Sequence, residues 1–70
     1  MSYKEYLSRE GFIYSKKNEA WIKGYGWGKS IKVMHLVKGL FEVIKGDEII
    51  YSDFIKSFEE FKQIIKKATL

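Results

Sequence analysis

The sequence predicts one small α+β domain spanning residues 1–70, with a short N-terminal helix, a four- to five-stranded antiparallel β-meander and a C-terminal amphipathic helix packed on one sheet face. Three observations support this fold class. The length of 70 residues fits a single small domain. The middle of the chain alternates apolar and polar residues with a period of two. The last turns carry apolar residues at helical spacing.

The N-terminal helix is predicted within residues 1–11. Ser2 and Glu5 form an S-x-x-E capping box, a typical helix start. Gly11 suits the left-handed position just beyond a helix end, where Phe12 can contact Leu7. A helix of at most three turns is marginal alone, so we expect it to dock on the rest of the domain.

Residues 12–52 form the predicted sheet, because β-forming residues dominate there. The connections between its strands are too short for parallel crossovers, so neighbouring strands should pair antiparallel. The predicted strands are residues 12–16, 20–27, 30–37, 40–45 and 48–51. The predicted turns are 17–19, 28–29, 38–39 and 46–47.

The C-terminal helix is predicted over residues 57–68. Ser57 and Glu60 form a second capping box, and acidic residues begin the helix while lysines end it. Five apolar residues fall within one arc of this helix and should lie on the sheet. They are Phe58, Phe61, Ile64, Ile65 and Ala68.

If every hairpin closes with a two-residue turn, the register assigns each strand residue to one sheet face. This register pairs Trp21 with Leu36, Lys23 with Met34, Tyr25 with Lys32, Val33 with Ile44, His35 with Glu42, Val37 with Leu40 and Ile44 with Ile49. The C-terminal helix is then expected on the face that bears the small residues Ala20, Gly24 and Gly26, together with Ile22, Ile31, Val33, His35, Val37, Leu40, Glu42, Ile44, Ile49 and Tyr51.

The second predicted face combines aromatic and basic side chains. Proteins that bind single-stranded nucleic acid use this combination to stack bases and neutralise phosphates. In this register Lys32 lies opposite Lys45, a like-charge pair that an anion would relieve. The candidate binding residues are Trp21, Lys23, Tyr25, Trp27, Lys29, Lys32, Lys38, Phe41 and Lys45. Met34, Leu36 and Val43 are expected on the same face.

Three uses of this face compete. The N-terminal helix can cover it as ordinary core, a second copy or another protein can dock on it, or nucleic acid can bind it. We favour a non-enzymatic binding module, acting as a homodimer, whose ligand is single-stranded or structured nucleic acid. The alternative is a small inhibitor or adaptor of the mobile-element or phage type, directed at a host enzyme or defence nuclease.

Catalytic, metal and cofactor sites are not expected. The glycine-rich segment 24–30 is not a phosphate-binding loop, because Lys23 stands where that motif needs glycine and residues 31–33 favour a strand. The single histidine, His35, has no further metal ligands at fixed spacing, and we expect it to hydrogen-bond Glu42. No small-molecule substrate is implied.

Composition bounds the partners. The net charge of +4 is uneven, with +5 in residues 1–40 and −1 in residues 41–70, which favours anionic partners. Aromatic residues make up 17% of the chain, an apolar surplus that points to a partner surface. Cysteine is absent, and neither a secretory signal nor a membrane span is recognisable, so a cytoplasmic location without membrane contact is expected.

Overall fold

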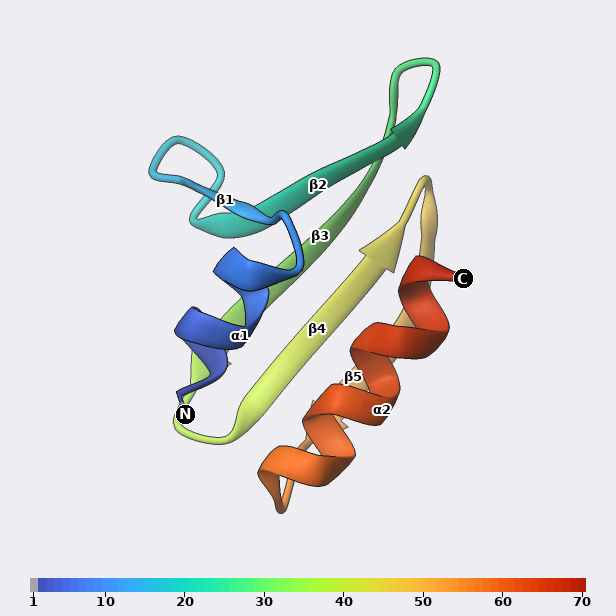
Figure 1. Cartoon of the computed structure of the whole chain (residues 1–70). Helices are drawn as coiled ribbons and strands as arrows, with labels where there is room; N and C mark the ends of the chain where they lie inside the picture. Colours follow the sequence, from blue (N-terminus) through green and yellow to red (C-terminus); the bar gives the residue numbers. More distant parts are fainter. Residues whose placement is uncertain (1) are drawn as a thin grey trace.

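The computed structural model describes residues 2–70, and Met1, at which the predicted segment 1–11 begins, lies outside the described residues. The elements follow the predicted order and confirm an α+β fold with an antiparallel meander (Figure 1). They are α1 (Tyr3–Arg9), β1 (Ile13–Ser15), β2 (Ala20–Gly26), β3 (Lys29–Val37), β4 (Leu40–Lys45), β5 (Glu48–Phe54) and α2 (Phe58–Thr69).

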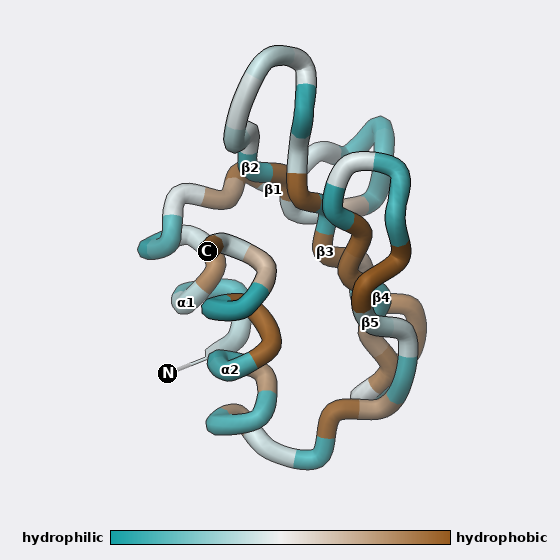
Figure 2. Tube along the Cα trace, turned by 90° about the vertical axis from the view of Figure 1, so that its right-hand side faces the viewer, coloured by the Kyte–Doolittle hydropathy of each residue, from teal (hydrophilic) through white to brown (hydrophobic). Residues whose placement is uncertain are grey.

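A single five-stranded sheet in the order β1-β2-β3-β4-β5 is the frame of the molecule. Each strand pairs antiparallel with the next. Both helices lie on the same side of this sheet, and no described helix lies on the other side (Figure 2). We refer to these two sides as the covered face and the uncovered face. The predicted packing of the C-terminal helix on one sheet face is confirmed.

Helix α1 begins and ends as its sequence predicts. The Ser2 hydroxyl accepts a hydrogen bond from the Glu5 N–H at 3.2 Å, which caps the first turn. The Phe12 N–H donates to the Leu7 carbonyl at 2.9 Å, the long bond of a Schellman ending. Gly11 has a φ of +93°, a conformation that glycine adopts without steric cost. Because Leu7 and Phe12 are buried, this ending also anchors α1 to the sheet.

Helix α2 is the longer helix and uses the same start signal. The Ser57 hydroxyl accepts a hydrogen bond from the Glu60 N–H at 3.2 Å. The helix proper begins after this cap, one residue later than predicted. All five residues of its predicted apolar arc belong to the core or pack against it.

The core lies between the covered face and the two helices. Aromatic rings join its layers: the ring centroids of Phe41 on β4 and Phe61 on α2 are 5.2 Å apart. Tyr6 of α1 contacts the same ring of α2 from the side, at 6.1 Å. The largest fully buried side chains are Leu7, Ile31, Val33, Val43 and Ile65.

Three of the four hairpins contain a β-bulge, in which one strand has one residue more than its partner. The extra residues are Tyr25 in β2, Leu36 in β3 and Ile50 in β5. The β2–β3 turn is also displaced from the predicted 28–29 to 27–28, where Gly28 supplies a φ of +66°. Because side chains alternate, each extra residue exchanges the faces of the strand beyond it.

These bulges decide which predicted pairs are correct. Val37 with Leu40 and Ile44 with Ile49 are confirmed, because each lies between a turn and the bulge that follows. The other predicted pairs are wrong, including the opposition of Lys32 and Lys45. The observed partners are Trp21 with Val33, Lys23 with Ile31, Lys32 with Ile44, Ile31 with Lys45, Met34 with Glu42 and His35 with Phe41.

The two faces therefore differ from the prediction. The covered face bears Trp21, Lys23, Ile31, Val33, His35, Phe41, Val43, Lys45 and Tyr51. The uncovered face bears Ile13, Ile22, Lys32, Met34, Val37, Leu40, Glu42, Ile44, Ile49, Ser52 and Phe54. Gly24 pairs with Ser30 on the uncovered side, so the predicted role of the small residues in receiving α2 is wrong.

Candidate binding surfaces

The structure separates the nine predicted binding residues. Phe41 is only 6% exposed and belongs to the core, where its ring stacks on His35 at 4.5 Å. Trp21 is half-buried on the covered face and packs against the same core. Lys38 lies in the β3–β4 turn, at the opposite end of β3 from the β2–β3 turn. These three side chains do not share a surface with the other six.

Lys23 has a structural partner. Its side chain lies on the covered face, and its Nζ donates to the Glu10 carbonyl at 2.6 Å. Glu10 is the C-terminal cap of α1, where the helix dipole attracts a positive charge. The same Nζ lies 5.9 Å from the centroid of the Phe12 ring. We interpret Lys23 as a tie between β2 and α1.

The remaining predicted residues gather near the tip of the β2–β3 hairpin, which extends beyond the rest of the sheet (Figures 1 and 2). Trp27 lies in the turn and is 100% exposed. An open groove of about 630 Å³ lies beside it, and we refer to it as the hairpin groove. It is lined by Tyr25, Gly28, Lys29, Ser30, Lys32, Lys45, Gly46, Asp47 and Glu48.

Charge and aromatic surface meet in the hairpin groove. The Lys45 Nζ lies 5.2 Å from the centroid of the Tyr25 ring, a cation–π contact. This Nζ also donates to the backbone oxygen of Leu70 at 3.3 Å. Three lysines line the groove, but Asp47 and Glu48 partly offset their charge.

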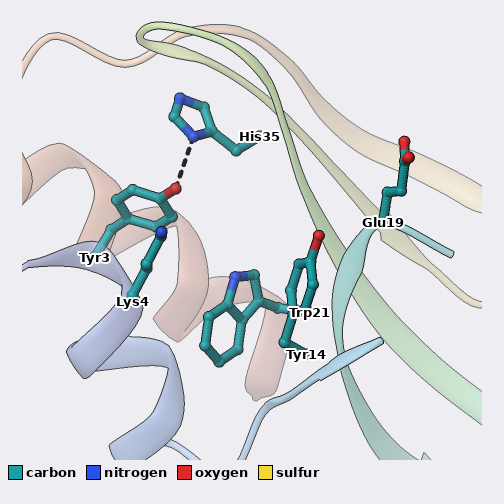
Figure 3. A pocket seen from close by; sticks show the side chains of 6 residues that line it. All are labelled: Tyr3, Lys4, Tyr14, Glu19, Trp21 and His35. Atoms are coloured by element: carbon teal, nitrogen blue, oxygen red, sulfur yellow. Dashed lines mark hydrogen bonds between the residues drawn. The ribbon is translucent and has the colours of Figure 1, made fainter. Parts of the chain in front are cut away.

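A second hollow, of about 380 Å³, lies on the covered side between α1 and the first strands (Figure 3). Two of its rings, those of Tyr14 and Trp21, meet edge to face with centroids 5.5 Å apart. It is lined by Tyr3, Lys4, Tyr14, Glu19, Trp21 and His35. We refer to it as the aromatic pocket.

Tyr3 and His35 form the polar part of the aromatic pocket. The Tyr3 Oη and the His35 Nδ1 are 2.7 Å apart, within hydrogen-bond distance (Figure 3). The predicted His35–Glu42 hydrogen bond is wrong, because the bulge at Leu36 turns Glu42 to the uncovered face, where it accepts a bond from Ser52 at 3.3 Å. Burial raises the pKa of Tyr3 above its ordinary value. The phenol therefore stays protonated at neutral pH, and its contact with His35 joins a ring of α1 to a ring of β3.

The uncovered face is organised in three rows of directly opposed residues. The first row crosses all five strands, the second crosses β3 to β5, and the third crosses the same strands near their other end. The rows are Ile13-Ile22-Lys32-Ile44-Ile49, then Met34-Glu42-Ser52, then Val37-Leu40-Phe54.

Large apolar side chains on this face are open to solvent. Ile13 is 75% exposed, Val37 59%, Ile49 58% and Phe54 55%. Ile22, Met34, Leu40 and Ile44 lie half-buried among them. Apolar exposure on this scale, gathered on one face, is typical of a surface that another molecule covers.

The sequence-based reasoning missed this face, although the sequence holds a signal for it. Adjacent apolar residues in one strand point to opposite faces whatever the register. Trp21-Ile22 in β2 and Val43-Ile44 in β4 are such pairs, and only one member of each contributes to the core. Their recurrence indicates a sheet with two apolar faces, one more than the helices cover.

Two further findings concern metal ligands and membrane-spanning helices. Within residues 2–70, no three or more His, Asp or Glu side chains are grouped as metal ligands would be. No helix in the described part of the chain is long and apolar enough to cross a membrane.

The comparison of this chain with models of protein families, with curated proteins and with solved structures finds no match.

Proposed function

We propose that the chain is a non-enzymatic protein-binding module and that the uncovered sheet face is its binding surface. One observation carries this proposal: three cross-strand rows of mainly apolar side chains lie on a face that no described helix covers. Both helices are committed to the other face by their own apolar residues. A cover for this face therefore has to come from outside residues 2–70.

The composition of the face favours a protein partner over nucleic acid. Sheet surfaces that bind single strands need aromatic rings on which bases stack. The rows here consist mainly of Ile, Leu, Val and Met, and Phe54 is their aromatic member. Aliphatic side chains with few charges are typical of the buried centre of a protein–protein interface.

A capture experiment tests this proposal. Tagged wild-type chain, Ile44→Lys and Trp27→Ser are each used to capture proteins from a lysate of the source organism. Ile44→Lys places a charge among the apolar side chains of the face, whereas Trp27→Ser removes a fully exposed apolar residue elsewhere. We expect Ile44→Lys alone to lose the partners, which include untagged copies of the chain. Equal capture by all three proteins would contradict the proposal.

A different observation favours nucleic acid as a second ligand. The hairpin groove brings Tyr25, Lys29 and Lys45 together, and the fully exposed Trp27 lies in the same turn as Gly28 of its lining. A Trp in this position contributes nothing to the core, while an exposed ring flanked by lysines can stack on an unpaired base. This candidate retains five of the nine residues predicted from the sequence, because Lys23 is tied to α1 and three others lie elsewhere. The five are Tyr25, Trp27, Lys29, Lys32 and Lys45.

Fluorescence anisotropy of a labelled single-stranded oligonucleotide tests the second candidate. We expect binding at low salt that weakens steeply as salt increases. Trp27→Ser and Lys29→Gln should weaken it, while Ile44→Lys should not, which is the reverse of the capture experiment. No anisotropy change at low salt would exclude this ligand.

A further inference from the structure

We propose that the partner on the uncovered face is a second copy of this chain, seated face to face across a two-fold axis. The inference rests on the proposed function, because it names the partner of the same surface. It is carried by the placement of two opposite charges among the apolar rows.

Lys32 and Glu42 are the charged residues of the three rows, and both hold central positions. Lys32 is the middle member of the five-residue row, and Glu42 is the middle member of the next row. They lie on neighbouring strands and are diagonal to each other, because Lys32 pairs with Ile44 and Glu42 with Met34. The ion pair found within residues 2–70 joins Lys62 to Glu59, so Lys32 and Glu42 do not pair with each other.

This arrangement is self-complementary. Consider two copies whose uncovered faces are opposed and whose two-fold axis runs midway between the two sheets. Seen along the normal to the sheets, this axis passes at right angles through the midpoint of the line from Lys32 to Glu42. It places Lys32 of each copy over Glu42 of the other, so two equivalent ion pairs form at the centre of the interface. Facing sheets pack about 10 Å apart, a gap that an extended lysine and a glutamate can bridge. The apolar side chains then enclose both pairs.

The size of the face agrees with a weak dimer. The first row crosses five strands about 4.8 Å apart and the other two rows cross three, so rows spread over about 20 Å offer roughly 350 Å² of projected area per copy. Two copies then bury about 700 Å², below the size of most stable specific interfaces. We therefore expect a dissociation constant in the high micromolar range.

Charge reversal tests the proposed contact. The mass of the full chain in solution is measured by light scattering and analytical ultracentrifugation from micromolar to millimolar concentration. Lys32→Glu and Glu42→Lys should each raise the dissociation constant at least about a hundredfold, because like charges then meet twice. Lys66→Glu on α2 changes the net charge as Lys32→Glu does but lies away from the face, and it should dimerise like the wild type.

Mixing the two variants separates the interface from any effect within one chain. In a mixed dimer, two acidic side chains of the Lys32→Glu copy meet two basic side chains of the Glu42→Lys copy. Neither variant should dimerise alone, but the equimolar mixture should regain the dimer mass. If Lys32 and Glu42 acted only within one copy, mixing would not restore the dimer, because each variant still carries like charges at both positions.

Two outcomes would overturn the dimer. One is a wild-type chain that stays monomeric at millimolar concentration, and the other is single variants that dimerise as well as the wild type. Circular dichroism of each variant establishes that it is folded. The capture experiment distinguishes failure of the dimer from failure of the proposed function. If wild type captures a different protein and Ile44→Lys does not, the proposed function is supported without the dimer. Such a partner would favour the inhibitor or adaptor class.

Discussion

Single residues in this domain show how the same side chain can stabilise at one site and destabilise at another. Tyr51 on β5 donates its hydroxyl to the Phe54 carbonyl at 2.9 Å and lies 3.3 Å from a Glu60 carboxylate oxygen. The Tyr6 ring is buried, at 9% exposure, but its hydroxyl has no hydrogen-bond partner within residues 2–70. A satisfied hydroxyl contributes about 1 kcal/mol, whereas an unsatisfied buried one has a desolvation cost of about 1–3 kcal/mol.

Removing each hydroxyl should therefore have opposite effects. We expect Tyr51→Phe to lower the free energy of unfolding by about 1 kcal/mol and Tyr6→Phe to leave it unchanged or raise it by up to about 1 kcal/mol. Urea unfolding followed by circular dichroism measures both values. A loss for Tyr6→Phe as large as that for Tyr51→Phe would show that the Tyr6 hydroxyl has a partner after all.

The Tyr51 phenol also makes stability depend on pH. Burial, and then the negative charges of Glu60 and Asp53, raise the pKa of Tyr51 above 10.0. Because the unfolded phenol loses its proton first, the contribution of Tyr51 is complete below pH 10.0 and is lost as the pH rises through the folded pKa. We expect the stability advantage of wild type over Tyr51→Phe to shrink above that pH. Subtracting the free energy of unfolding of Tyr51→Phe from that of the wild type removes the effect of lysine titration, which both proteins share. A difference that stays constant above pH 10.0 would contradict the expectation.

At the scale of the elements, what can be predicted from sequence depends on whether the determinant is local. Both helix caps follow from residues three apart, Ser2 with Glu5 and Ser57 with Glu60, and both form. The strands and their order follow from alternation and turn residues, with bounds within a few residues. The faces do not follow, because a bulge such as the one at Leu36 inserts one unpaired residue that the alternation of the sequence does not reveal.

The same limit explains the candidate site. The pairs closest to the β3–β4 and β4–β5 turns were predicted correctly, but the extra residues Leu36 and Ile50 exchange the faces beyond them. In the β2–β3 hairpin the turn itself is displaced, and the extra residue Tyr25 exchanges the faces beyond it. Phe41 thereby moves from the predicted binding face into the core, and Ile44 moves out of it. Residues at the hairpin tip keep their predicted exposure, because a tip is exposed in either register.

Neighbouring residues on β4 provide a direct check of the observed faces. Val43 is 0% exposed on the covered face, and Ile44 follows it on the uncovered face. At protein concentrations low enough for monomers, we expect Val43→Ala to cost about 2 kcal/mol or more. Ile44→Ala should cost under about 1 kcal/mol, because its side chain is only half-buried. Equal losses in denaturant unfolding would contradict the register.

At the scale of the whole molecule, the thin core and the uncovered face belong together. A chain of 70 residues buries only about 60% of the surface that it exposes when unfolded, so its core is small. The uncovered face is a second apolar surface as wide as the sheet, and it is buried only when a partner is bound. Stability of the domain and occupancy of the face are thus linked by mass action.

This linkage predicts a concentration dependence. We expect the urea midpoint of the wild type to rise as the protein concentration increases through the dimer dissociation constant, since dimerisation stabilises only folded chains. The midpoint of Ile44→Lys should stay constant over the same range. A wild-type midpoint independent of concentration would argue against a second copy on the face.

The positions of the two tryptophans have a practical consequence for spectroscopy. Trp21 lies half-buried against the core, while Trp27 at the hairpin tip is already surrounded by water. An indole that is already hydrated changes little in emission when the chain unfolds, so the unfolding signal belongs to Trp21. A molecule that binds at the hairpin tip and leaves the aromatic pocket empty shifts the emission of Trp27 while the fold is intact. The chain thus carries two intrinsic optical reporters, one for the folding of the domain and one for molecules that reach its tip.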